Sequence, residues 1–381
     1  TQYGTYTSGE LTTFAAVNAT MQTAIKYALA QYASFSGLTF TQNTASPGSA
    51  TLRFAMSDAA SPTSYAYYPT AAVQGGDVWF GTQTGGSAMT NPVLGGYAFI
   101  SAMHEIGHAL GLKHGQETGG PANTAMTAAH DSMEYSIMTY LSYTGGPATG
   151  YTNEQWGFAQ TPMMYDIAAI QDMYGANFSG PSSQIYSFDP ATGQELINGV
   201  GQGAPGGNRI FRTIWDGGGN AEYDFSNYTT NETVRLTPGG YSTLSPVQLA
   251  YLGSGHYADG EIFNALQYNG DVRSLIRFVK LGSGTNTAVG NAANNVMEGG
   301  SGDNTITTGA GADVILFTLN DMKGTHTDTI TDYVSGTDVL RLDPGAGCQF
   351  EQQGAIKTAM RFKSTSSMVA VCRNLAARMR A

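Results

Sequence analysis

Three histidines and one glutamate of this chain are spaced like the ligands and the base of a catalytic metal site. His104, Glu105, His108 and His114 fall in the pattern H-E-x-x-H-x-x-G-x-x-H. His104 and His108 share one face of a helix because they lie four residues apart, and Gly111 can end the helix and turn the chain so that His114 returns. Three neutral nitrogens and one open position describe a catalytic zinc site, so we expect one zinc ion here.

The chemistry expected at this site is hydrolysis by an activated water. Zinc lowers the pKa of a water ligand from about 15.7 towards about 7, which makes hydroxide available at neutral pH. Glu105 would accept the proton of that water and later deliver it to a leaving amine. A structural zinc site would need a fourth protein ligand and would leave Glu105 without a role. A helix that merely carries surface histidines would not require the whole pattern.

A second motif, Ser136-Ile137-Met138-Thr139-Tyr140, follows downstream. A long zinc motif followed by such a turn resembles the metzincins. The two motifs together are similar to those of the serralysins, secreted bacterial proteases with calcium-binding tails. The resemblance implies that Met138 forms a hydrophobic floor beneath the histidines. It also implies that Tyr140 lies near the zinc, as a weak ligand or as a hydrogen-bond donor to the oxyanion. Taken alone, a Met-x-Tyr sequence is more often core packing.

The resemblance covers most of residues 10 to 343. Segments Tyr65–Pro69 and Gly75–Phe80 resemble the strands ahead of the active-site helix, and Asp166–Asn177 resembles the helix that closes the protease domain. Trp215–Gly219 and Tyr223–Ser226 resemble the start of the C-terminal domain of the family. The implied fold class is α+β, with an α/β metzincin protease domain at 1–178 and a mostly β C-terminal domain at 179–381. The second domain would comprise a linking β segment (179–280), a short degenerate parallel β-roll (about 281–316) and a terminal β segment (317–381).

Local patterns predict the elements that position the site. Apolar residues at helical spacing follow Ser8 and predict a helix with one buried stripe. The stripe consists of Leu11, Phe14, Val17, Met21, Ile25, Ala28 and Leu29. Alternation predicts strands at Leu38–Phe40, Thr51–Met56 and Val78–Phe80, and residues 96–112 should form the zinc helix. The family begins with a strand ahead of its first helix, and here only Thr1–Thr7 precede that helix.

Composition agrees with an exported enzyme and argues against a nucleic-acid-binding or membrane-spanning protein. Charged residues make up 12% of the 381 residues, and the net charge is −11. Nucleic acid favours a basic patch, so we expect protein or peptide substrates and no nucleic-acid partner. No apolar run reaches the roughly 18 residues of a membrane span. We expect a monomer, since no interface signal stands out.

A nine-residue period between 281 and 316 predicts the β-roll. Its registers are Leu281–Val289, Gly290–Glu298, Gly299–Thr307 and Thr308–Leu316. In the pattern G-G-x-G-x-D-x-U-x, turn carbonyls and the sixth-place Asp face calcium. The sixth residues are Asn286, Asn295, Asn304 and Asp313, so one of four keeps the carboxylate, and Asp303 is displaced by one place. We therefore expect fewer or weaker calcium sites than in typical family members. A flexible glycine-rich linker is the alternative.

Candidate calcium ligands lie in the roll turns, after the roll, and at a Trp-Asp-x-Gly-Gly turn. Those in the roll are Gly299, Gly300, Gly302, Asn304, Gly309, Gly311 and Asp313. By resemblance, Asp328, Asp332, Asp216, Gly218 and Gly219 are further candidates. Ala221 stands where the family turn has a second Asp, which weakens the match there. Asp328 and Asp332, considered without the resemblance, would more often be solvated loop carboxylates.

The two cysteines and the C-terminal segment bear on whether the protein is secreted. Cys348 and Cys372 could form a disulfide outside the cell, although structural cysteines, free or paired, are the default interpretation. Resemblance to serralysins implies secretion by a type I system that reads the C-terminus, without a cleaved N-terminal signal. Serralysins end in an acidic and then aliphatic signal, whereas Asn374–Ala381 is basic.

These patterns favour a secreted, calcium-stabilised zinc endopeptidase. One alternative is a catalytically idle calcium-binding surface or adhesion protein on a protease scaffold, but such a protein would be free to lose Glu105. Another is a different zinc hydrolase, such as an amidase or another metzincin branch. The nonapeptide period and Ser136–Tyr140 favour the serralysin branch instead.

Overall fold

The computed structural model describes residue 6, residues 8–83, 88–318, 321 and 326–343, and the backbone alone of Phe350–Gln352 and Met360–Lys363. The chain divides into two compact units. Unit 1 comprises Thr1–Asn177, Gly203–Trp215 and Leu249–Tyr268, and unit 2 comprises Phe178–Gln202, Asp216–Gln248 and Asn269–Ala381. The chain first crosses between units after residue 177, and it returns to unit 1 twice. The division into functional domains at residue 178 stays a prediction.

Unit 1 contains a small mixed sheet in the order β1-β2-β4-β3, so β3 is an edge strand. Its strands are β1 (Ala15–Ala16), β2 (Arg53–Met56), β3 (Ser64–Ala66) and β4 (Asp77–Phe80). β2 runs parallel to β4, while β1 and β3 are antiparallel to their neighbours. The strands predicted at Thr51–Met56 and Val78–Phe80 are confirmed, with β2 beginning two residues late and β4 one residue early.

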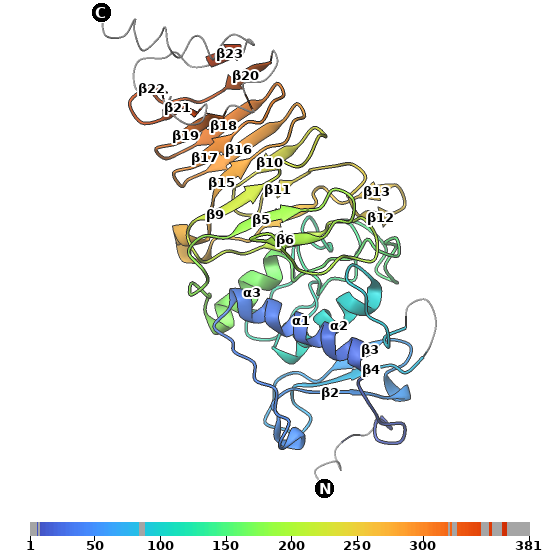
Figure 1. Cartoon of the computed structure of the whole chain (residues 1–381). Helices are drawn as coiled ribbons and strands as arrows, with labels where there is room; N and C mark the ends of the chain where they lie inside the picture. The colour runs from blue at the N-terminus through green and yellow to red at the C-terminus, as the bar shows by residue number, and fades with distance from the viewer. Residues whose placement is uncertain are drawn as a thin grey trace, which may run out of the picture. The chain divides into compact units, whose positions relative to one another are not determined.

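Three helices pack in unit 1 (Figure 1). They are α1 (Ala19–Phe35), α2 (Tyr97–Ala109) and α3 (Met164–Tyr174). Helix α1 contacts both α2 and α3, and α2 packs on β3 and β4. Every residue of α2 after Tyr97 is buried, which suits a helix that carries a site inside the unit. The helices expected at 96–112 and Asp166–Asn177 are confirmed with shifted ends.

The first helix begins later than the sequence pattern predicted. α1 starts at Ala19, where the Asn18 side chain caps it by accepting a hydrogen bond from the Met21 N–H at 2.9 Å. The chain before it forms turns and the short strand β1, and Leu11 and Phe14 are 40% and 57% exposed. The predicted helix was therefore wrong for the residues before Ala19, because Ala15 and Ala16 pair with β2 instead of continuing a helix.

A second prediction is also wrong. Leu38–Phe40 form no strand and are at least partly exposed, since alternation over three residues does not by itself provide a pairing partner. The predicted initial strand within Thr1–Thr7 lies outside the described residues apart from Tyr6. Cys348, Cys372 and Asn374–Ala381 also lie outside them.

The segments that return to unit 1 add short strands. β14 (Ile262–Asn264) pairs in parallel with β8 (Arg212–Ile214), and β12 (Tyr251–Gly253) forms a hairpin with β13 (His256–Tyr257). Two short 3-10 helices, Pro47–Ser49 and Asp58–Ala60, flank β2.

Unit 2 is built from β-strands and contains the predicted roll. One sheet has the order β22-β21-β19-β17-β15-β9-β5-β6-β7, and another has the order β10-β16-β18-β20-β23. The strands of the first sheet are β5 (Ile185–Phe188), β6 (Glu195–Ile197), β7 (Val200–Gly201), β9 (Ala221–Asp224), β15 (Ile276–Lys280), β17 (Val296–Glu298), β19 (Val314–Thr318), β21 (Val339–Asp343) and β22 (Phe350–Gln352). The strands of the second are β10 (Thr233–Arg235), β16 (Thr287–Asn291), β18 (Thr305–Gly309), β20 (Thr327–Ile330) and β23 (Met360–Lys363). The short strand β11 (Tyr241–Ser242) and the 3-10 helix Val272–Ser274 complete the unit.

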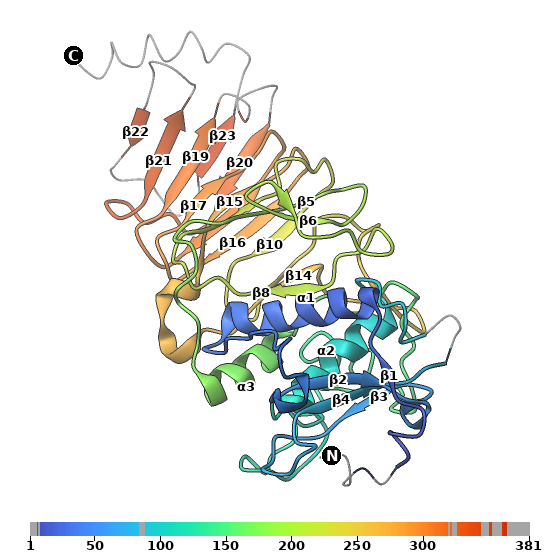
Figure 2. The ribbon, with the colours of Figure 1, turned by 60° about the horizontal axis from the view of Figure 1, so that its bottom comes forward.

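The roll strands pair in parallel with partners two nonapeptides away (Figure 2). Thr287 pairs with Thr305, and Val296 pairs with Val314, so successive nonapeptides alternate between the two sheets. Ile306 and Ile315 are fully buried, as expected for the apolar position of the repeat. The parallel β-roll and the α+β fold class are confirmed.

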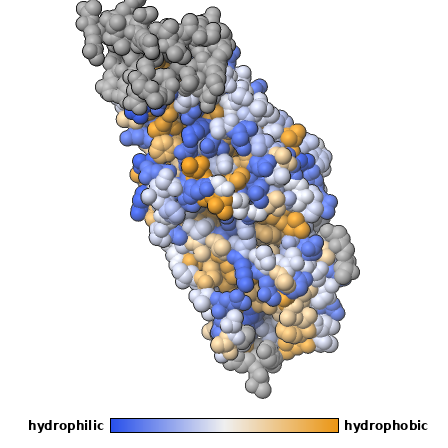
Figure 3. Space-filling model, in the orientation of Figure 1, coloured by the Kyte–Doolittle hydropathy of each residue, from blue (hydrophilic) through white to orange (hydrophobic). Residues whose placement is uncertain are grey.

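None of the helices described here is both long and apolar enough to span a membrane. On the face drawn in Figure 3, hydrophobic residues are interspersed with hydrophilic ones.

Candidate metal centre

Helix α2 and the turn after it bring the three histidines together. His104 and His108 lie one helical turn apart, with ring centroids separated by 4.7 Å. The helix ends at Ala109, and Gly111 adopts a φ of +109° that favours glycine. The His114 ring then lies 4.5 Å from the His108 ring and 5.3 Å from the His104 ring. The structure thus unites the three residues that the motif singled out.

Each histidine is oriented through its Nδ1 atom. The Nδ1–H groups of His104 and His108 donate to the carbonyl oxygens of Ile137 and Leu112, each at 2.7 Å. The Nδ1 of His114 lies 2.8 Å from a carboxylate oxygen of Glu117. Because carbonyls accept and cannot donate, the Nδ1 atoms carry the protons and leave the Nε2 lone pairs for a ligand.

The Nε2 atoms of the three rings suit a zinc ion. The three ligand atoms lie within 4.8 Å of one another, and the Nε2 atoms of His108 and His114 are 3.0 Å apart. Tetrahedral zinc with Zn–N bonds of about 2.0–2.1 Å would separate two nitrogens by about 3.3 Å. Burial lowers the pKa of His104 to about 3 and that of His108 to about 4, so both rings are neutral at pH 7. Neutral imidazoles are the form that binds zinc, so the residues fit the predicted ion.

Glu105 lies in the same site and is 7% exposed. Its Oε1 accepts a hydrogen bond from the Ser64 hydroxyl at 3.1 Å, while its Oε2 has no hydrogen-bond partner among the described residues. Burial raises the pKa of Glu105 to about 7, and the hydrogen bond from Ser64 opposes this rise. A buried carboxyl group with a pKa near neutrality is suited to accept and return a proton.

Met138 packs against the zinc helix. A Cβ atom added to Gly107 would come within 2.8 Å of the Met138 sulfur, so this side chain lies directly against α2 between His104 and His108. Met138 is 2% exposed. Its role as a floor to the site stays a prediction.

Tyr140 also lies beside the histidine cluster. Its hydroxyl lies 2.8 Å from Nε2 of His114, and the residue is 39% exposed. Burial of the phenol raises the pKa of Tyr140, so it is protonated and able to donate a hydrogen bond at neutral pH. Its role as an oxyanion donor or weak ligand stays a prediction.

Sequence reasoning missed two carboxylates that support the ligands. Glu117 orients His114, and its spacing of three residues from that ligand was the available signal. Asp166 accepts hydrogen bonds from the Ser136 hydroxyl at 2.6 Å and from the Ile137 N–H at 2.8 Å. Asp166 therefore holds the carbonyl that orients His104, although the sequence marked it only as the start of a helix.

A cavity of about 480 Å³ opens onto the site. Its walls come from the edge strand (residues 63–66), from α2 with His114, and from residues 148–151, together with Tyr68 and Tyr140. Among the residues that the structure describes, the lining contains no Lys or Arg, and Glu105 is its one carboxylate. These lining side chains therefore offer no Lys or Arg cation to a substrate carboxy terminus.

The candidate calcium turn at Asp216 is occupied by protein donors. Asp216 accepts hydrogen bonds from the Gly218 N–H at 2.7 Å, from the Tyr186 hydroxyl at 3.0 Å and from the Gln184 amide at 3.1 Å. Gly219 follows with a φ of +88°. Both carboxylate oxygens of Asp216 thus have partners.

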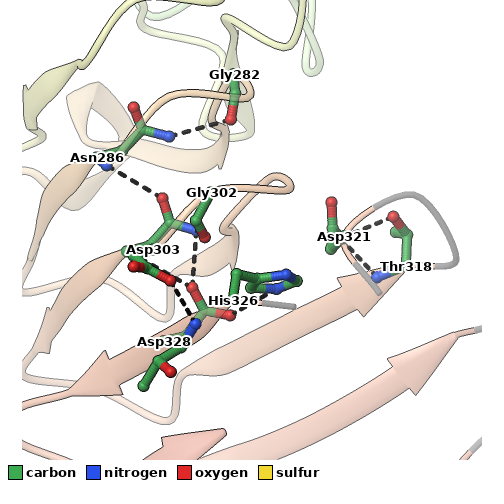
Figure 4. Close-up of polar contacts among 10 residues, drawn as sticks. Gly282, Asn286, Gly302, Asp303, Thr318, Asp321, His326 and Asp328 are labelled. Atoms are coloured by element: carbon green, nitrogen blue, oxygen red, sulfur yellow. Dashed lines mark hydrogen bonds and ion pairs between the residues drawn. The ribbon is translucent and has the colours of Figure 1, made fainter. Parts of the chain in front are cut away.

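In the roll, two asparagines close turns with their amide groups. Asn286 donates through Nδ2 to the Gly282 carbonyl at 3.0 Å (Figure 4). Asn304 donates likewise to the Gly302 carbonyl at 2.7 Å. The Asn304 oxygen accepts from the Asn286 N–H at 3.2 Å, so the orientation of its amide follows from its partners. Asn304 also donates to Asp328 at 2.8 Å. These contacts bring an amide N–H, and not a carboxylate oxygen, to the two turn carbonyls. The calcium roles of Gly302 and Asn304 stay predictions.

The remaining candidates of the roll lie partly on the same turn and partly on later ones. Gly299 and Gly300 share the turn of Gly302, and Gly309 and Gly311 precede Asp313. Asp313 accepts from the Asn295 N–H at 2.7 Å, while its buried Oδ2 has no hydrogen-bond partner among the described residues. Asp332 accepts from the N–H groups of Thr308 and Gly309, each at 2.8 Å. Asp313 therefore has a spare oxygen for a cation, and its calcium role stays a prediction.

Comparison with protein families gives three matches along the chain. Residues 5–137 match the matrixin model, residues 179–251 match the serralysin C-terminal model of peptidase M10, and residues 282–315 match the RTX calcium-binding nonapeptide repeat. The repeat match coincides with the predicted roll and with its parallel strands.

Curated relatives agree with these matches. A metalloprotease AprA of Pseudomonas entomophila is 30% identical over 72% of this chain and 53% of the relative. Serralysin C of Dickeya chrysanthemi is 33% identical over 47% of this chain and 37% of the relative, and a serralysin of Proteus mirabilis is 31% identical over 49% and 37%. The matched region spans about half or less of the length of these relatives.

The three family matches follow one another along the chain, and the first of them contains the whole zinc motif of residues 104–114. Together with the serralysin relatives, they show that the chain belongs to the serralysin-type metzincins.

Proposed function

We propose that this protein is a zinc-dependent endopeptidase that hydrolyses internal peptide bonds of protein substrates. The observation that carries the proposal is the convergence of three Nε2 atoms, each on a ring oriented through Nδ1, beside the buried carboxyl group of Glu105. The proposal includes secretion and stabilisation by calcium, which rest on the family resemblance.

The residues of the site divide the work of hydrolysis. His104, His108 and His114 would hold zinc, which supplies a Lewis acid that acidifies a water ligand and polarises the scissile carbonyl. Glu105 would accept the proton of the attacking water through its free Oε2 and then donate it to the leaving amine. The Tyr140 hydroxyl would donate a hydrogen bond to the oxyanion as it develops.

The edge strand supports binding of an extended substrate. β3 pairs with β4 on one side and stands at the edge of its sheet, where it lines the cavity. An extended peptide can add to such an edge through main-chain hydrogen bonds, which do not depend on its sequence. Since no Lys or Arg among the described residues lines the cavity, recognition of internal segments is favoured over recognition of a carboxy terminus.

The test is hydrolysis of labelled casein by this chain and by a Glu105→Ala variant, both supplied with zinc and calcium. We expect activity in the parent and its collapse by a factor of about 10³ or more in the variant. Equal activity in both would refute the role of Glu105. If both were inert with zinc bound at full stoichiometry, the idle-scaffold alternative would replace this proposal.

A further inference from the structure

The edge strand β3 connects the catalytic glutamate to a buried group on the opposite face of the sheet. Side chains alternate along a strand, so Ser64 and Tyr65 point to opposite faces. Ser64 lies towards α2, where its hydroxyl donates to Oε1 of Glu105 at 3.1 Å. Tyr65 lies on the other face, in an apolar cluster with Trp79.

On that second face, two tyrosine hydroxyls bind one buried carboxylate. Tyr65 and Tyr67 donate to Oε1 of Glu10 at 2.8 and 2.7 Å. Glu10 is fully buried, and its Oε2 accepts from the Ser8 N–H at 3.0 Å. Glu10 lies in the turns before α1, so the N-terminal segment is fastened to the strand that lines the cavity. We call this arrangement of Glu10, Tyr65 and Tyr67 the tyrosine clasp.

The Ser64 contact constrains Glu105 where nothing else in the described structure does. Oε2 of Glu105 is buried and has no hydrogen-bond partner among the described residues, so the Ser64 hydroxyl is the group that selects the orientation of the carboxylate. A terminal carboxylate torsion is otherwise broad, with only weakly preferred angles. A base held in one orientation spends more time ready to take a proton from water beside the ligands.

We propose that Ser64 is a positioning residue for Glu105, and that the tyrosine clasp holds the strand that carries Ser64. This inference rests on the proposed function, because it assigns Ser64 to the same base. It makes the N-terminal segment around Glu10 part of the support of the active site. A shift of β3 by a few tenths of an ångström would lengthen the 3.1 Å contact and loosen the carboxylate.

The first test separates turnover from binding. Ser64→Ala, Ser64→Thr and the parent would be compared on a quenched-fluorescence peptide with zinc supplied. We expect Ser64→Ala to lower kcat about tenfold with KM within about twofold, and Ser64→Thr to retain most of kcat because it keeps the hydroxyl. Ser34→Ala is the matched control, since the Ser34 hydroxyl is exposed and donates only within α1, to the Gln31 carbonyl.

The second test asks whether the clasp acts through Ser64. Tyr67→Phe removes one hydroxyl donor to Glu10 and leaves the ring in place. We expect it to lower kcat about threefold in the parent and to have no effect on kcat in the Ser64→Ala background. Additive effects on kcat in the double variant would overturn the link between the clasp and Ser64.

A third measurement does not depend on activity. Crystal structures of the metal-free parent, Ser64→Ala and Ser64→Thr proteins would show the Glu105 carboxylate directly. We expect one orientation in the parent and Ser64→Thr, and a rotated or disordered carboxylate in Ser64→Ala. An unchanged carboxylate in Ser64→Ala, or an active parent whose kcat is insensitive to that change, would overturn the inference. An inactive parent would instead overturn the proposed function, and the metal-free structures would still decide the role of Ser64.

Discussion

In unit 1 three histidines leave their Nε2 atoms directed at one point, whereas in unit 2 the Asn286 and Asn304 amides are already bound to backbone groups. Both regions carry a family metal motif. The zinc motif is complete and its geometry fits the ion. The calcium motif has Asn in place of Asp at three of four sixth positions.

The difference shows how one side-chain atom changes what a turn of the roll offers to a cation. A carboxylate that faces a carbonyl has two acceptors in contact, and a cation between them relieves the repulsion. An asparagine in the same place supplies an N–H instead, which can donate to the carbonyl. In the described roll, the asparagine turns are therefore satisfied, whereas Asp313 has a spare buried oxygen.

The largest expected effect is loss of the zinc site. His114→Ala should abolish stoichiometric zinc binding at micromolar metal and lower peptidase activity by a factor of about 10³ or more, because two ligands hold zinc poorly. Zinc content after gel filtration and casein hydrolysis are the measurements. His256→Ala, at an exposed histidine, is the control. Retained zinc in His114→Ala would end the assignment of this ligand.

The second-largest effect is expected when the Asp of the repeat pattern replaces Asn304. Asn304→Asp should lower the free energy of unfolding by about 2–4 kcal/mol in EGTA, because a carboxylate would then face the Gly302 carbonyl and Asp328. Calcium should restore most of this loss by binding the new oxygen cluster. Denaturant unfolding with and without calcium checks the prediction.

Asn294→Asp is the matched control for that change. It adds the same charge at an exposed position whose side-chain oxygen accepts from the Ala312 N–H at 3.0 Å, so we expect little change in stability. If Asn304→Asp were as stable as the parent in EGTA, the amide would not be what closes the turn.

A smaller effect is expected from the carboxylate behind a zinc ligand. Glu117→Gln keeps an acceptor for the Nδ1–H of His114 but removes the charge, and zinc affinity should fall about tenfold. Competition with a chromophoric chelator measures the affinity of the variant and of the parent side by side. Unchanged affinity would mean that the Glu117 contact only packs the loop.

The smallest effect concerns a buried carboxylate in unit 1. Glu134 is 8% exposed and accepts from the Asp259 N–H at 2.6 Å, and burial raises its pKa to about 7. Since the folded state binds this proton more tightly than the unfolded chain, the free energy of unfolding should fall as pH rises from about 4.5 to about 7. Glu134→Gln should remove the contribution of Glu134 to that fall and stabilise the metal-free protein at pH 8 by about 1–3 kcal/mol.

The corresponding experiment is urea unfolding at pH 4.5 and pH 8. Glu154→Gln is a contrasting variant, because Glu154 pairs with Arg209 and its loss should destabilise the protein at pH 8. Equal stability of Glu134→Gln and the parent at pH 8 would show that the buried carboxyl group carries no such cost.

Much of the site was predictable because it is local in sequence. His104 and His108 follow helical spacing, Gly111 marks the turn, and His114 follows at once, so short-range geometry is sufficient. The roll was predictable for a similar reason, since its nine-residue period repeats the same turn. The helix predicted from Ser8 failed because β1 pairs with β2, a contact that local spacing does not contain.

The sequence by itself determined the family and the existence of the roll, and it predicted the candidate zinc ligands and the candidate base, because each rests on residue type at fixed short spacing. Only the tertiary structure decided which groups orient those residues. Asp166 and Ser64 contact residues of the site from segments far away along the chain, and Glu10 contacts the strand that carries Ser64. The partners of each asparagine side chain in the roll depend in the same way on how the turns stack. A hydrogen bond acts over about 3 Å, so the chain must fold before the donor and the acceptor come that close.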